Sequence, residues 1–133
     1  MTKYDVYQEI FIKAGKAGQQ ALEECTPTPM VVQQHENPLN DDSPVVKSWR
    51  VSGGVCGFAW VHIAPGNCSF ARWLRKKNYA GKAYRGGVDI WINAGGQSLE
   101  RKQAYAHAMA AYLNDHKSEI GNPKYIYAQS RID

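Results

Sequence analysis

His62 and Asp89 are the two side chains in this sequence best suited to proton transfer. Each lies in a short run of alternating apolar and polar residues, 55–63 for the histidine and 88–93 for the aspartate. Histidine titrates near neutral pH, so a carboxylate partner would make it a candidate acid–base group. No serine or cysteine nucleophile is tied to the pair by its spacing. A structural histidine is therefore the simpler interpretation, and an enzyme or anion site around this pair is the alternative function.

Aromatic side chains accompany the histidine on the same faces of the alternating runs. The candidate binding rings are Trp49, Trp60, Trp91, Tyr125 and Tyr127. Nucleic-acid bases stack on rings exposed on an open sheet, at about 1–3 kcal/mol per base. The same rings are typical of a homodimer interface, because aromatic residues anchor protein interfaces. They would also suit the core of a third layer of structure.

A basic segment lies between Asn67 and Val88 in a chain whose net charge is only +4. It contains no acidic residue and six cations, Arg72, Arg75, Lys76, Lys77, Lys82 and Arg85. Such a segment attracts phosphate, although it is also typical of a solvated helix face. We select Arg72, Arg75, Lys76 and Arg85 as candidate binding residues.

Metal ligands and cofactor motifs are not predicted. Cys25, Cys56 and Cys68 lack the paired spacing of a zinc site, and no two histidines fall one helical turn apart. No apolar run approaches the roughly 20 residues that span a bilayer, and the N-terminus lacks a signal-peptide pattern. We expect a cytoplasmic protein that does not associate with membranes.

The elements that must position these side chains follow from periodicity. Apolar stripes predict helices over 5–24, 70–77 and 99–117. Alternation predicts strands over 30–35, 45–51, 55–63, 88–93 and 124–131, with a loop over 37–43. The glycines at 53 and 54 predict a hairpin that joins 45–51 to 55–63.

The fold class expected from this order is α+β, in a single domain over residues 1–133. We predict a two-layer sandwich with one mainly antiparallel sheet of four to five strands and about three helices on one face. The central strand, 55–63, would turn Ala59, Val61 and Ile63 towards the helices and Trp60 and His62 away from them. A slip of one residue would reverse a strand. A fully covered, three-layer sheet is the alternative.

Four segments of the chain resemble uncharacterised proteins encoded by tailed bacteriophages. They are Gly57-Phe58-Ala59-Trp60-Val61-His62-Ile63, Gly86-Gly87-Val88-Asp89-Ile90-Trp91-Ile92, the helix over 97–113, and the closing Ser130-Arg131-Ile132-Asp133. The resemblance implies a small virus-encoded accessory protein that acts in the bacterial cytoplasm. It implies no activity and no catalytic residue.

The sequence thus predicts a binding or self-assembly module in preference to an enzyme. Its surface would be the aromatic sheet face, flanked by the basic segment. The expected partner is a second copy of the chain or a single-stranded nucleic acid.

Overall fold

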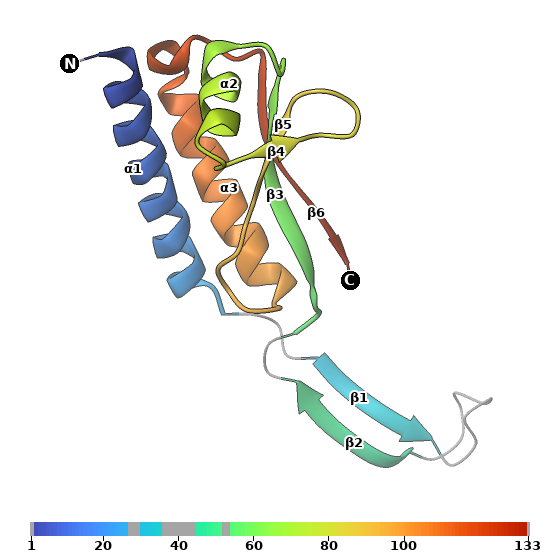
Figure 1. Cartoon of the computed structure of the whole chain (residues 1–133). Coiled ribbons are helices and arrows are strands. Elements are labelled where there is room, and N and C mark those ends of the chain that lie inside the picture. Colours follow the sequence, from blue (N-terminus) through green and yellow to red (C-terminus); the bar gives the residue numbers. More distant parts are fainter. Residues whose placement is uncertain (1, 27–29, 36–44, 52–53, 133) are drawn as a thin grey trace.

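The computed structural model describes residues 2–26, 30–35, 45–51 and 54–132 (Figure 1). Its helices are α1 (Lys3–Glu24), α2 (Ser69–Lys76) and α3 (Leu99–Asp115), followed by a short 3-10 turn, η1 (Lys117–Ile120). Its strands are β1 (Met30–His35), β2 (Val45–Val51), β3 (Gly57–Ala64), β4 (Gly81–Lys82), β5 (Val88–Trp91) and β6 (Tyr125–Ile132).

Four strands form one antiparallel sheet in the order β4-β5-β3-β6. The three helices lie together on one side of this sheet (Figure 1). The predicted α+β class, with an antiparallel sheet and helices on one face, is therefore confirmed. The sequence did not predict β4, because two residues are too few to show an alternating pattern.

The central strand β3 has the two unlike faces that its sequence predicts. Ala59, Val61 and Ile63 are at most 1% exposed and belong to the core under the helices. Trp60 and His62 alternate with them and are only partly buried. The register is thus the predicted one, because small aliphatic side chains let the helices approach the sheet closely.

Helices α1 and α3 pack against each other through small residues. The ring of Tyr105 on α3 lies directly over Gly18 of α1, where a side chain would have no room. Ala14 and Ala106 are fully buried nearby. Helix α1 begins two residues earlier than predicted because Thr2 caps it, and α3 ends at Asp115, where the chain tightens into η1.

The predicted hairpin between 45–51 and 55–63 is wrong. β2 pairs with β1 in a separate two-stranded sheet, from Met30 opposite Val51 to His35 opposite Val45. Strand β3 has no edge left for β2, because β5 and β6 occupy both of its sides. The predicted loop over 37–43 lies outside the described residues.

Candidate binding site on the open sheet face

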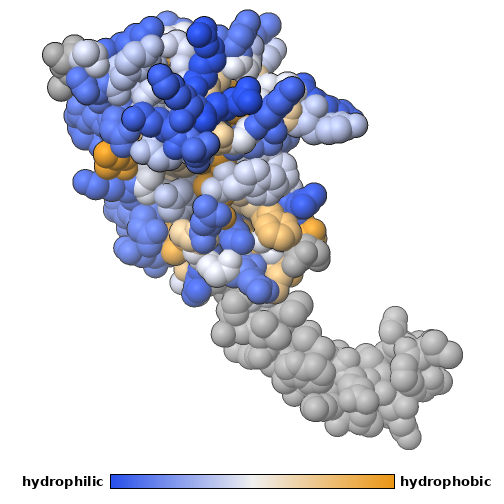
Figure 2. Space-filling model, viewed as in Figure 1, coloured by the Kyte–Doolittle hydropathy of each residue, from blue (hydrophilic) through white to orange (hydrophobic). Residues whose placement is uncertain are grey.

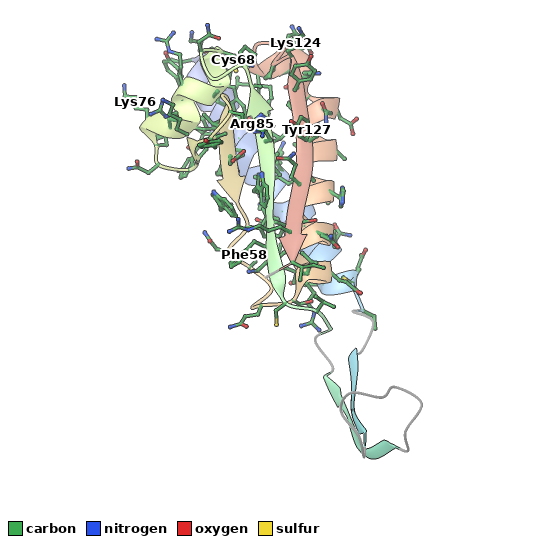
Figure 3. The ribbon with its side chains drawn as sticks, turned by 90° about the vertical axis from the view of Figure 1, so that its right-hand side faces the viewer. Phe58, Cys68, Lys76, Arg85, Lys124 and Tyr127 are labelled. Carbon is green, nitrogen blue, oxygen red and sulfur yellow. The ribbon has the colours of Figure 1, made fainter. Side chains whose placement is uncertain are left out.

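The face of the four-stranded sheet that points away from the helices carries most of the predicted site. We define the aromatic face as Phe58, Trp60, His62, Asp89, Trp91, Tyr125, Tyr127, Gln129 and Arg131. Figure 3 looks onto this face, with Phe58, Arg85 and Tyr127 labelled. Trp91, Tyr125 and Tyr127 are 44%, 51% and 43% exposed. In the described part of the chain, therefore, no third layer covers these rings.

Two rows of side chains cross the strands of this face. In the first row Trp60 stands between Trp91 and Gln129. Its ring centroid lies 4.7 Å from that of Trp91, and its Nε1–H donates a 3.0 Å hydrogen bond to Oε1 of Gln129. These contacts hold the Trp60 ring in one orientation, which lowers the entropy lost when a ligand stacks on it.

The second row contains the predicted His–Asp pair. His62 stands between Asp89 and Tyr127, and its Nδ1 lies 2.7 Å from Oδ1 of Asp89. An ionised carboxylate only accepts hydrogen bonds, so Nδ1 carries the proton that is shared with Asp89. The two side chains are 13% and 15% exposed, and the ring centroid of Tyr127 lies 5.2 Å from that of the histidine.

The loop between β4 and β5 rises above the sheet on the side away from the helices (Figure 1). It turns the face into a cleft of about 450 Å³, with His62 and Asp89 among its walls. The other lining residues are Trp60, Ala83, Tyr84, Arg85, Gly86, Tyr127 and Gln129. Gly86 and Gly87 turn the loop with φ angles of 98° and 78°, which glycine adopts most readily. The cleft thus brings aromatic, cationic and titratable groups together.

Two cations lie at the end of the aromatic face that is formed by Phe58. The guanidinium carbon of Arg131 lies 5.4 Å from the ring centroid of Phe58, and Nζ of Lys102 lies 5.2 Å from it. Both are within cation–π range. Within the described residues, Lys102 and Ser98 are the buried polar side chains, and Lys102 is 8% exposed.

The predicted basic segment divides between two surfaces. Of its four candidate residues, only Arg85 lines the cleft. Arg72, Arg75 and Lys76 lie on α2, and Figure 3 shows Lys76 at the side of the molecule, away from the aromatic face. The division follows from packing, because Phe70, Trp73 and Leu74 turn one side of α2 into the core and leave its cations on the other.

Trp49 is the one predicted ring that the four-stranded sheet does not include. Its residue belongs to β2, which pairs with β1, and its side chain lies outside the described residues. The selection of binding residues from the sequence missed Gln129, Arg131 and Tyr84. Gln129 and Arg131 stand two and four residues after Tyr127, so alternation along the strand predicted over 124–131 puts them on the face of the candidate rings. Tyr84 lies in a loop, where no periodicity marks it.

Comparisons with protein-family models, curated proteins and solved structures give no match. The resemblance to phage proteins therefore stays a prediction. Among the described residues, no group of three or more His, Cys, Asp or Glu side chains is placed to hold a metal ion. None of the helices in that part of the chain is long and apolar enough to cross a membrane.

Proposed function

We propose that the aromatic face binds single-stranded nucleic acid, with bases stacked in and beside the cleft. The observation that carries this proposal is the cleft itself, in which Trp60 and Tyr127 adjoin Arg85 beneath an overhanging loop. Its volume of about 450 Å³ lies within the range of sites for small organic groups, about 300–1,000 Å³. Stacking on rings is tolerant of sequence, so we expect little preference among bases.

The charges of the aromatic face support a phosphate-bearing ligand. Arg85, Arg131 and Lys124 supply positive charge at the cleft, at the Phe58 end and beside Tyr125. Asp89 is the only carboxylate among the residues that define the face, and it forms a hydrogen bond with His62. A phosphodiester chain that crosses the rings would therefore meet cations and little repulsion.

A homodimer through the same rings is the competing interpretation. The cores of protein interfaces are depleted of charged residues. Here Arg85, Asp89 and Arg131 lie among the rings, and burying them between two copies would require a partner for each charge. This composition favours a nucleic acid, and the solution mass of the protein distinguishes the two.

The first test follows tryptophan fluorescence while a single-stranded oligonucleotide is added, at about 50 mM and about 200 mM salt. We expect saturable quenching that weakens at the higher salt. Trp91→Ala should lower the affinity about 5- to 150-fold, because the loss of one stacking ring costs about 1–3 kcal/mol. Ile12→Ala is the control, since Ile12 is 46% exposed on α1, outside the aromatic face. Unchanged fluorescence at both salts, together with a dimeric mass that Trp91→Ala abolishes, would establish self-association instead.

A second candidate function rests on the 2.7 Å contact between His62 and Asp89. A histidine oriented by a carboxylate can accept and return a proton, and here the pair lines a cleft. Single-stranded RNA incubated with the protein should then be cleaved, because His62 can accept the proton of a 2′-hydroxyl as that oxygen attacks the adjacent phosphorus, and can return a proton to the departing 5′-oxygen. Single-stranded DNA, which lacks the 2′-hydroxyl, should stay intact, and His62→Ala should abolish RNA cleavage while leaving salt-dependent binding in place. Intact RNA after long incubation would leave binding as the function. In either case we place the protein in the cytoplasm, where single-stranded nucleic acid is available.

A further inference from the structure

We infer that a second site, in the helix layer, binds a phosphate-bearing ligand, independently of the aromatic face. The first turn of α1 and the outer side of α2 enclose a groove of about 470 Å³. We call it the basic groove, and its lining residues are Lys3, Tyr4, Ser69, Arg72, Trp73, Lys76 and Lys77. Figure 2 shows hydrophilic side chains gathered over this part of the surface, where α2 and the start of α1 lie.

The floor of the basic groove is fixed by packing. Trp73 is 5% exposed, and its ring makes edge contacts with Tyr7 and Phe11 of α1, at centroid distances of 5.9 and 6.2 Å. Ser69 accepts a 3.0 Å hydrogen bond from the hydroxyl of Tyr7. Both walls therefore belong to helices that are locked together, so a ligand would meet a preformed surface.

The charge of the groove is one-sided. Four of its lining residues are cations, Lys3, Arg72, Lys76 and Lys77, and none is an acid. The ion pairs within the described residues join Lys13 to Glu9, His62 to Asp89 and His116 to Glu119. None of the four groove cations takes part in them. Lys3 lies 5.2 Å from the ring centroid of Tyr4, and a ligand with several negative charges would give the four cations ion-pair partners.

The stability of α2 does not account for all of these cations. Arg75 and Lys76 lie in the last turn, where positive charge suits the helix dipole. Arg72 lies one turn earlier, four residues before Lys76, and like charges at that spacing repel. No acidic residue lies in the first turn to balance them. Helix stability thus leaves Arg72 unexplained, and a ligand that Arg72 binds together with Lys76 would explain it.

The chemistry of these groups indicates phosphate. Arginine binds phosphate oxygens with two parallel hydrogen bonds, and lysines add point charges around them. Three or more cations along a groove fit a chain of linked phosphates better than one small anion. We commit to a free polyphosphate, because the groove offers cations for a short phosphate chain and the ring on its floor, Trp73, is 5% exposed and so gives bases little surface to stack on.

Isothermal titration calorimetry of the full chain with inorganic tripolyphosphate tests this inference. We expect one saturable site, and a loss of affinity of at least about tenfold in Arg72→Ala with Lys76→Ala. The matched control is Arg85→Ala with Lys124→Ala, which removes the same charge from the aromatic face and should change the affinity less than about threefold. Circular dichroism confirms that both double variants are folded.

Two results would overturn the inference. The first is the absence of a heat signal at millimolar tripolyphosphate, and the second is an equal loss of affinity in both double variants, which would show diffuse attraction to a basic protein. A single-stranded oligonucleotide and vesicles with an anionic phospholipid then identify the source of the phosphates. If Arg72→Ala with Lys76→Ala weakens the binding of either of these more than the binding of tripolyphosphate, a free polyphosphate is not the ligand. Trp91→Ala should leave tripolyphosphate binding unchanged, which separates this site from the proposed function.

Discussion

At the scale of single residues, the His62–Asp89 pair is the most specific contact on the aromatic face. The pair joins two strands at 2.7 Å, with both side chains largely shielded from water. Hydrogen bonds to charged groups contribute more to stability in such surroundings than at the surface.

We expect a double-mutant cycle with His62→Ala and Asp89→Ala to give a coupling of about 0.5–3 kcal/mol in urea unfolding. The exposed pair of Glu9 and Lys13, at 2.9 Å, serves as the control and should couple less, because water screens it. Equal coupling in the two pairs would mean that burial does not strengthen the contact between His62 and Asp89.

Tyr105 makes the stability of the folded protein depend on pH in the alkaline range. Burial against α1 raises the pKa of the Tyr105 hydroxyl above its ordinary value of 10.0. The unfolded chain then loses this proton at lower pH than the folded chain, so unfolding becomes easier as pH rises through that range. Tyr105→Phe should therefore flatten the fall in stability between about pH 9 and pH 11, measured by urea unfolding. An unaltered slope in the variant would assign the alkaline loss to other groups.

The residue scale is also where the sequence was most informative. Alternation along two runs was enough to put Trp60 and His62 on the same face of the sheet as Asp89 and Trp91. The antiparallel pairing of β3 with β5 then sets His62 opposite Asp89 and Trp60 opposite Trp91. Alternation did not reveal Gln129 as the hydrogen-bond partner of Trp60. That contact depends on β6 lying beside β3, and no local pattern encodes which strands become neighbours.

At the scale of elements, the contact between α1 and α3 depends on one glycine. A Cβ atom at Gly18 would lie 2.7 Å from the Tyr105 ring, closer than atoms pack. At Gly15, on the same helix, the nearest atom would be the Tyr105 hydroxyl at 3.4 Å, an ordinary contact.

We therefore expect opposite results from two alanine substitutions in α1. Gly18→Ala should destabilise the protein by about 1–3 kcal/mol, because the helices must separate. Gly15→Ala should be neutral or stabilising by up to about 1 kcal/mol, because alanine favours the helix. Thermal unfolding followed by circular dichroism measures both. Similar effects of the two changes would show that helix propensity, and not packing, governs this contact.

The limits of sequence interpretation are clearest at the element scale. Stripes of apolar residues gave α1, α2 and α3 nearly in full, since each helix buries one side. The two glycines at 53 and 54 predict a hairpin turn, yet β3 pairs with β5 and with β6, which lies far along the chain. Turn signals are local, whereas the pairing of β3 is decided by which strands complete the sheet over the helices.

At the scale of the whole molecule, the chain builds one helix-covered sheet and a separate hairpin of β1 and β2. The prediction of a single domain over 1–133 stays open to a direct test. The end of α1 and the start of β3 lie at the same end of the helix-covered sheet (Figure 1).

We expect residues 27–53 to be replaceable by a Gly/Ser linker of about eight residues, a length that flexible chains span easily. The melting temperature of the shortened protein should stay within about 5 °C of the full chain. The same variant tests Trp49, because oligonucleotide affinity should not change if the aromatic face alone binds. A lost cooperative transition would instead make the hairpin part of one folding unit.

The loop that forms the cleft requires glycine at position 87, where a side chain would have no room. A Cβ atom at Gly87 would lie 2.6 Å from the carbonyl oxygen of Ile63 and 2.8 Å from Cε1 of His62. Two and three positions before Gly87, Arg85 and the fully exposed Tyr84 form the rim of the cleft without entering the core. Residues 84 and 85 can therefore be changed to alter which ligands the cleft prefers, while position 87 must stay glycine. A library randomised at these two rim positions would yield folded proteins with altered ligand preference, so the loop suits directed evolution of new binders.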